Sequence, residues 1–361
     1  MDAFRNLPDS SQLRELPLQA YTPVSQARTT RTDVGRPAHR CVDVHNHLGR
    51  WLTDDGTWMT GDVEALLALM DRRDVATIVN LDGRWDGELE DNLARYDVAH
   101  PGRFATFCQL DWSLLAHHDG PARLVRSLER SRAAGARGLK VWKDLGLQWR
   151  DGAGDLVLPD DARLGPVFDA AGALGLPVLI HTADPVAFFE PLDARNERLE
   201  ELCAQPDWWF GDPARFPTFA RLMAALETLV AAHPGTTFIG AHVGCYGEDL
   251  AWVSRMLGTY PHFAVDLGGR LGELGRQPRA FRRLVTDHPA QVLFGTDGFP
   301  ASDDVYTTYY RFLESADEHF PYAPGEPVPP QGRWQISGAC LPAEVLPALY
   351  AGNARRLVDL G

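Results

Sequence analysis

Eight short apolar segments recur along the chain, and each is bounded by turn-forming residues. They occupy residues 41–44, 75–79, 104–110, 137–142, 178–180, 237–240, 262–267 and 292–294. Most are rich in Val, Ile, Leu or Phe and show no strict alternation of polar with apolar positions, which is typical of parallel strands buried on both faces. The pattern therefore predicts eight buried parallel strands.

Helical periodicity fills several of the intervals between these strands. Residues 122–134, 163–174 and 218–232 carry apolar positions at helical spacing. A His-Pro or Tyr-Pro pair stands before four of the strands, at 100–101, 233–234, 260–261 and 288–289. Because proline cannot continue a helix, each pair is expected to end a helix and turn the chain into the next strand.

The alternation of strand and helix predicts an α/β protein, a (β/α)8 TIM barrel with right-handed crossovers. A doubly wound open sheet is the alternative, but no G-x-G-x-x-G follows the first strand to favour its dinucleotide-binding version. Two connections are long, residues 182–236 after strand 5 and 298–342 after strand 8. We expect both to be insertions at the catalytic face, or small aromatic cores beneath long loops. The predicted domains are a polar N-terminal arm, 1–40, and a single barrel domain, 41–361.

Composition and charge narrow the class of protein. Of the 361 residues, 45% are hydrophobic and 23% charged, the proportions of a soluble globular protein. No apolar run approaches the roughly 18 residues of a membrane span, and the N-terminus shows no secretory signal. The formal charge of −14 argues against a nucleic-acid partner. Five scattered cysteines without a C-x-x-C pair indicate a reduced, cytoplasmic protein.

Polar side chains that can bind a metal ion follow four of the predicted strands. His45 and His47 are two residues apart, so their imidazoles point to the same side of the extended chain. His181, His242 and Asp297 each come directly after a later strand. Because the carboxyl ends of barrel strands meet at one mouth, we expect a site for one divalent cation there, Zn2+ or else Mn2+ or Fe2+. For any single histidine, a core role with bonds to backbone groups is the alternative.

The order of these motifs resembles that of the amidohydrolase superfamily. The matching segments are D-V-H-N-H at 43–47, His181, A-H-V-G at 241–244, F-G-T-D at 294–297 and G-N-A-R-R-L at 352–357. More narrowly, the chain looks like the amidohydrolase-related branch that includes aminocarboxymuconate semialdehyde decarboxylase and the resorcylate decarboxylases. The resemblance covers residues 41–358.

The resemblance implies a role for each residue at the mouth of the barrel. His45, His47, His181 and Asp297 would bind the metal ion, and His242 would be a catalytic acid/base residue. Asp297 would also be catalytic, as the acceptor of a proton from water.

Two lysines lie at the fourth strand. In binuclear members of the family a carboxylated lysine there bridges two metal ions, and Lys140 is the candidate for that role. A cationic lysine that holds a substrate carboxylate is the competing role, and a surface lysine is the alternative to both.

Several further side chains are candidates for contact with substrate. Arg50, Arg84 and Arg270 each follow a strand and would project at the catalytic face, where an arginine can bind a carboxylate through two hydrogen bonds. Surface salt bridges are the alternative for each arginine. Trp142 and Lys143 complete the set. We therefore expect a small anionic or aromatic substrate.

These features predict a metal-dependent hydrolase that uses a metal-activated water on a small amide, lactone or related compound. The alternative is a metal-dependent non-oxidative decarboxylase, a carbon–carbon lyase, acting on a small aromatic or unsaturated carboxylic acid. A non-catalytic metal-binding barrel is a further alternative. Analogy with the family also allows a homodimer.

Overall fold

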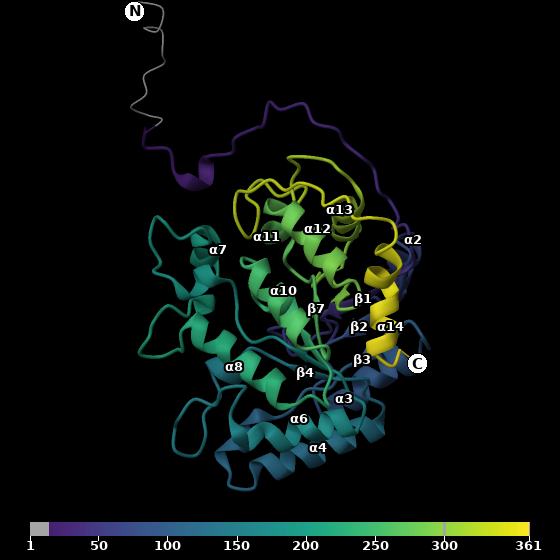
Figure 1. Cartoon of the computed structure of the whole chain (residues 1–361), viewed down its shortest axis with the longest axis vertical. Helices are drawn as coiled ribbons and strands as arrows, with labels where there is room; N and C mark the ends of the chain where they lie inside the picture. Colours follow the sequence, from purple (N-terminus) through teal and green to yellow (C-terminus); the bar gives the residue numbers. More distant parts are fainter. Residues whose placement is uncertain (1–13, 299–300, 361) are drawn as a thin grey trace, which may run out of the picture.

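Within residues 14–298 and 301–360, which the computed structural model of the protein describes, eight strands form the centre and helices surround them (Figure 1). The strands are β1 Cys41–Asn46, β2 Val75–Asn80, β3 Phe104–Thr106, β4 Leu139–Val141, β5 Val178–Ile180, β6 Phe238–Gly240, β7 Phe263–Asp266 and β8 Val292–Leu293. They pair in the orders β1-β2-β3 and β4-β5-β6-β7-β8, and every pair is parallel.

Contacts at two places close these two sheets into one barrel. A parallel bridge between Cys108 and Leu139 joins the chain after β3 to β4. On the opposite side, the backbone N–H of Val44 in β1 donates to the carbonyl of Phe294, just beyond β8, over 3.0 Å. The predicted (β/α)8 barrel is therefore confirmed.

The helices lie between and around the strands. The longer ones are α2 Val63–Arg72, α3 Asp86–Leu93, α4 Gly120–Ala134, α6 Gly165–Ala173, α8 Phe219–Ala232, α10 Leu250–Thr259, α12 Pro278–Asp287 and α13 Asp303–Glu314. Shorter ones are α5 Asp144–Leu147, α7 Leu199–Ala204, α9 Ala241–Gly244, α11 Leu271–Arg276 and α14 Asn353–Leu357. Single turns are η1 Leu18–Ala20, η2 Ala94–Val98, η3 Trp112–Ala116, η4 Ala162–Leu164 and η7 Ala348–Gly352.

Side-chain caps mark where four of these helices begin. Asp62, Thr218, Asp249 and Ser302 each accept a hydrogen bond from a backbone N–H in the first turn of α2, α8, α10 and α13, respectively. Short polar side chains at this position satisfy donors that the helix itself leaves unpaired.

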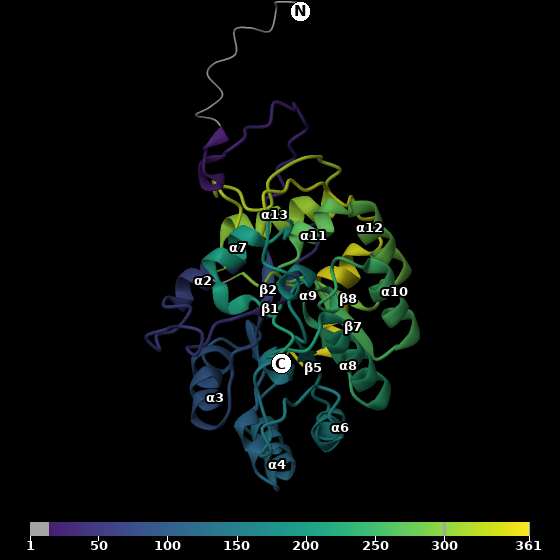
Figure 2. The same ribbon diagram turned by 90° about the vertical axis from the view of Figure 1, so that its left-hand side faces the viewer.

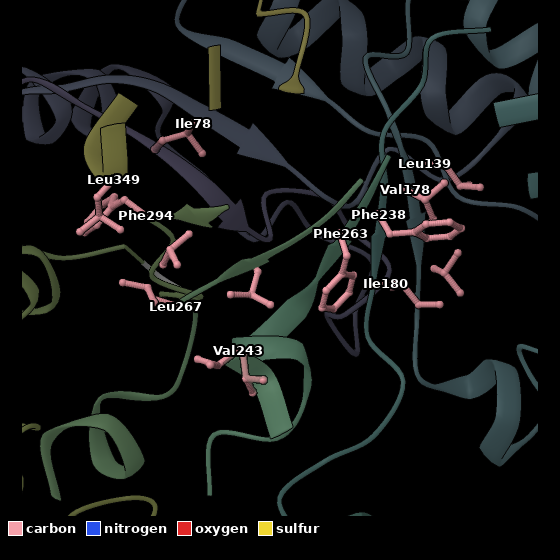
Figure 3. Packing of buried hydrophobic residues seen from close by; sticks show 14 of the residues in the cluster. Ile78, Leu139, Val178, Ile180, Phe238, Val243, Phe263, Leu267, Phe294 and Leu349 are labelled. Atoms are coloured by element: carbon pink, nitrogen blue, oxygen red, sulfur yellow. The ribbon is translucent and has the colours of Figure 1, made fainter. Parts of the chain in front are cut away.

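Strand side chains are buried on both faces of the barrel wall. Val178 and Ile180 of β5 belong to the large core between strands and helices (Figure 3). Leu179 belongs to a second cluster, with Ile239 and Leu293, on the opposite face of the strands. Because successive side chains of a strand point to opposite faces, this division explains the continuous apolar runs in the sequence.

The two long connections carry structure of their own. Residues 182–236 contain η5 Val186–Phe189, α7 and η6 Pro206–Trp208 before α8 begins. Helix α7 lies at the same end of the molecule as α11 (Figure 2) and is joined to it by an ion pair between Arg198 and Glu273. The connection 298–342 contains α13, and its residues 299–300 lie outside the described ranges.

Residues 14–40 run along the outside of the barrel (Figure 1). The backbone N–H of Thr32 donates to Asp317 over 2.6 Å, and that of Ala38 donates to Glu314 over 2.8 Å. The first 13 residues of the predicted arm lie outside the described ranges. None of the helices in those ranges has the length and apolarity needed to cross a membrane.

Candidate functional site

Five side chains from four strand ends converge at the mouth of the barrel. His47 Nε2 lies 3.4 Å from Asp297 Oδ1, and His45 Nε2 lies 3.6 Å from the same oxygen. His242 Nδ1 lies 3.9 Å from Asp297 Oδ2. The rings of His181 and His242 are 4.4 Å apart, centroid to centroid. The structure thus brings together all five residues proposed from the sequence as ligands or as catalytic groups.

Two of these residues have an unusual backbone. His242 and Asp297 both have a φ of +56°, the left-handed region that non-glycine residues rarely adopt. Such a conformation persists where surrounding contacts enforce it. Here the N–H of Asp297 donates to the carbonyl of His45 over 2.8 Å, and the N–H of His242 donates to Asp266 over 3.1 Å. The chain turns sharply after β6 and β8, and these turns carry both side chains into the site.

Two buried carboxylates orient the histidines of β1. His45 Nδ1 lies 2.9 Å from Asp266 Oδ2, and His47 Nδ1 lies 2.7 Å from Asp82 Oδ1. Burial alone would raise the pKa of each carboxyl, but interaction with its histidine holds the pKa below the usual range. A carboxylate at Nδ1 favours the tautomer whose Nε2 lone pair is available to a metal ion.

Asp82 and Asp266 were not among the residues proposed from the sequence. Asp266 ends β7 and Asp82 follows β2, so each stands at the end of a strand, as Asp297 does. The signal that identified Asp297 was therefore present for both.

The donor atoms fit a divalent cation. His45 Nε2, His181 Nδ1 and Asp297 Oδ1 are buried and have no hydrogen-bond partner among the described residues. One ligand atom each from His45, His242 and Asp297 lies within 4.8 Å of the others. Burial lowers the pKa of His181 to about 3 and that of His242 well below its usual value, so both are neutral near pH 7. Neutral imidazole and carboxylate are the forms that bind metal ions, and a cation would satisfy the unpaired atoms.

The two lysines of the fourth strand have different surroundings. Lys140 is wholly buried in β4, and its Nζ has no hydrogen-bond partner among the described residues. Burial lowers its pKa to about 8. Lys143 Nζ pairs with Asp184 over 2.5 Å, and Asp184 in turn lies 3.2 Å from His181 Nε2.

A cavity of about 790 Å³ opens onto the donor atoms. His181, His242 and Asp297 line it, together with Trp142 and Lys143. Residues of both long connections complete its walls, among them Phe188, Arg198, Trp208, Pro330 and Gln331. Its surface therefore combines flat aromatic rings with a few charged groups, which suits a small planar ligand.

Arg270 is one of the charged residues in this cavity. It follows β7, and its side chain is almost wholly buried. Its Nη1 donates to the carbonyl of Gly269 over 3.1 Å, and among the described residues it makes no ion pair. Glu201, Glu248 and Glu273 act on Arg270 electrostatically, but none of them forms an ion pair with it. The buried guanidinium can therefore pair with an anionic ligand.

The other two candidate arginines do not line this cavity. Arg50 pairs with Asp91 over 2.7 Å, and its guanidinium lies 4.7 Å from the centre of the Trp58 ring. Arg84 donates to the side-chain oxygen of Gln109 over 3.0 Å and stacks 4.0 Å from Trp85. Both follow strands as expected, but neighbouring aromatic and polar side chains hold them elsewhere.

The sequence profile of the amidohydrolase family matches residues 42–360. The chain belongs to the amidohydrolase family. This match confirms the resemblance seen in the motifs, and the protein is an enzyme of this family. The search of curated proteins found no match.

Solved structures of similar proteins share the fold of this amidohydrolase. A 2,6-dihydroxybenzoate decarboxylase complexed with 2,6-dihydroxybenzoate is 17% identical with a TM-score of 0.56, over 88% of this chain and 99% of the other. A dihydroxybenzoic acid decarboxylase from a Polaromonas species, with bound manganese and 2-nitroresorcinol, is 16% identical with a TM-score of 0.55, over 88% and 96%. The 5-carboxyvanillate decarboxylase from Sphingomonas paucimobilis is 16% identical with a TM-score of 0.53, over 89% and 99%.

Proposed function

We propose that this amidohydrolase catalyses the metal-dependent, non-oxidative decarboxylation of a small aromatic or unsaturated carboxylic acid. The observation that carries the proposal is Arg270, a buried guanidinium without an ion pair in the cavity of the metal-donor residues. A buried charge is stable only with a counter-charge, and a carboxylate matches a guanidinium through two hydrogen bonds. The decarboxylases among the similar solved structures support this choice of substrate class.

The metal ion would be held by His45, His47, His181 and Asp297. We favour Zn2+, with Mn2+ or Fe2+ as alternatives. Of the two alternatives, Mn2+ is the first to test, because one similar structure contains bound manganese. A divalent ion bound there would polarise an oxygen of the substrate. His242 belongs to the same compact group of donor atoms, so the metal content of a His242→Ala variant distinguishes a ligand from an acid/base residue.

The remaining residues would bind the substrate and move one proton. Trp142 and Trp208 flank the ring, Arg270 neutralises an acidic group of the substrate, and Lys143 adds a second cation beside Asp184. His242 or Asp297 takes up one proton from solvent and delivers it to the ring carbon that bears the carboxylate. The carbon–carbon bond then breaks, its electron pair returns to the ring, and CO2 leaves.

Release of CO2 tests this proposal directly. Metal-free enzyme is reconstituted with Zn2+ or Mn2+ and incubated with 2,6-dihydroxybenzoate and 5-carboxyvanillate, with the metal-free enzyme as control. We expect metal-dependent CO2 release and, in D2O, one deuterium at the carbon that lost the carboxylate. Absence of CO2 release in every metal form would contradict the proposal.

Hydrolysis is the second candidate, and the observation that favours it is the carboxylate of Asp297. Its Oδ1 is buried, has no hydrogen-bond partner among the described residues, and lies beside His45 Nε2. A carboxylate so placed can accept a proton from an attacking water. Incorporation of 18O from labelled water into the product of an unsaturated lactone, without CO2 release, would favour hydrolysis over decarboxylation.

A further inference from the structure

A buried cluster of charged side chains lies next to Arg270. At its centre is Arg198, only 1% exposed, which immediately precedes α7 in the connection after β5. Its Nη1 donates to Glu201 of α7 over 2.6 Å, and its Nη2 pairs with Glu273 of α11. The side chain of Glu273 is likewise 1% exposed. This ion pair joins the connection after β5 to the helix that follows β7.

Glu273 and Arg270 are neighbours on one face at the start of α11. Arg270 is the residue before the helix and Glu273 comes three residues later, a spacing that places side chains side by side. Gly247 packs against both, since a Cβ there would lie 3.4 Å from Glu273 Cβ and 3.6 Å from Arg270 Cδ. Yet in this structure Glu273 pairs with Arg198 and not with Arg270.

The carboxylate of Glu273 could accept a second cation. Its Oε2 is buried and has no hydrogen-bond partner among the described residues. Burial would raise its pKa, but Arg198 first and Arg270 second hold the pKa below the usual range. An ionised carboxylate that lost Arg198 would be left buried and uncompensated, a strongly unfavourable state. Arg270 is the neighbouring cation that could relieve it.

We propose that Arg198 is a positioning residue: it pairs with the carboxylate of Glu273 and thereby leaves Arg270 able to bind the carboxylate of the substrate. The inference rests on the proposed function, in which Arg270 binds the anionic group of the substrate. Arg198 itself is an unsuitable anion site. Two carboxylates already neutralise it, and its guanidinium lies 5.2 Å from the centre of the Trp334 ring and 5.9 Å from that of Phe188.

A set of variants with two independent readouts tests the proposal. R198Q, E273Q and the double variant R198Q/E273Q are prepared as metal-loaded enzymes, and 2,6-dihydroxybenzoate is the binding probe in calorimetry. In a crystal structure of R198Q we expect the Arg270 guanidinium to pair with Glu273. Binding of the probe should weaken roughly 10-fold or more in R198Q, in line with the loss of a hydrogen-bonded charge contact, and return to within about 3-fold of wild type in the double variant.

Two results would overturn the proposal. One is a crystal structure of R198Q in which Arg270 still faces the cavity unpaired. The other is a double variant that binds the probe no better than R198Q, because that result shows that Glu273 is not the carboxylate that competes for Arg270. Should R198Q fail to fold, E273Q alone decides: removal of the competing carboxylate should leave probe binding unchanged or stronger, whereas weaker binding contradicts the proposal.

A matched control and a separate readout isolate the effect. Arg276 lies on the same helix, pairs with Glu197 over 2.9 Å and stacks 3.8 Å from Trp334. R276Q should leave probe binding unchanged. If wild-type enzyme neither binds 2,6-dihydroxybenzoate nor releases CO2, the proposed function fails, but the position of Arg270 in the R198Q crystal structure still tests the inference.

Discussion

The cavity has two parts that are built in different ways. Its donor floor consists of the lining residues His181, His242 and Asp297, together with His45 and His47, which lie against Asp297. Its cation wall consists of Lys143, Arg198 and Arg270. Floor residues sit at strand ends, where the barrel itself fixes their backbone. Of the wall residues, Lys143 follows β4, Arg270 immediately precedes α11, and Arg198 lies in the connection after β5. The ion pair between Arg198 and Glu273 joins that connection to α11. The comparison suggests that the floor determines the chemistry and the wall determines which acid is bound.

The largest effect is expected from a change to the floor. Asp297→Asn removes an anionic donor but keeps the size of the side chain. Activity should fall on the order of 10³-fold or more, as for loss of a central catalytic group, and metal content should fall with it. CO2 release and elemental analysis measure both, and circular dichroism checks the fold. Full activity with a full complement of metal would show that Asp297 is neither a metal ligand nor a catalytic residue.

The carboxylates beneath the floor should matter less than the donors. Asp82→Asn replaces the acceptor for His47 Nδ1, 2.7 Å away, and Asn can present its N–H2 group there instead. Loss of such a partner typically lowers metal affinity about 10- to 100-fold. Competition with a fluorescent chelator measures the affinity. Asp91→Asn is the matched control, since that carboxylate is exposed and pairs with Arg50; its metal affinity should equal that of wild type.

The pH dependence of the free energy of unfolding of the metal-free enzyme distinguishes the histidines of the floor from the ion pairs at the wall. In the folded chain burial lowers the pKa of His181 to about 3 and that of His242 well below 6.5, whereas both titrate near 6.5 when unfolded. Below that pH the unfolded state binds more protons, so His181 should lower the free energy of unfolding by about 2 kcal/mol between pH 7 and pH 5. His242 should change it in the same direction. Glu273, whose folded pKa is lowered, loses its contribution only as the pH falls below about 4.5.

Urea unfolding at pH 7, 6 and 5 measures this slope. His181→Asn should reduce it, and His117→Asn, in an exposed loop, should leave it unchanged. Equal slopes in wild type and His181→Asn would show that His181 is not held neutral.

A change to the wall should affect binding without loss of metal. Arg270→Gln removes the guanidinium that makes no ion pair within the described ranges. A hydrogen bond to a charged group contributes about 1.5–3 kcal/mol, so KM for the acid should rise roughly 10- to 100-fold while metal content stays complete. Steady-state kinetics and elemental analysis check the two halves of this prediction. Loss of metal in Arg270→Gln would mean that wall and floor are not separable.

The floor could be predicted from the sequence much better than the wall, because the two parts are built in different ways. The barrel and its floor follow from local order, because a histidine or aspartate directly after a buried strand must lie at the mouth. The same rule would also have identified Asp82 and Asp266. Arg198 was not, since Glu273 lies 75 residues away and nothing in the intervening sequence indicates that the two side chains pair.

The smallest effect is expected from Arg84→Gln. Comparison of this variant with Arg270→Gln contrasts two arginines that were both proposed because they follow a strand. Arg84 and Arg270 both follow strands and both were candidate substrate contacts, but Arg84 stacks on Trp85 and bonds Gln109 outside the cavity lining. Surface substitutions away from a site usually change stability or binding by less than about 0.5 kcal/mol, so KM should stay within about 2-fold of wild type. A rise in KM equal to that of Arg270→Gln would mean that position after a strand, and not contact with the cavity, decides which arginine binds the substrate.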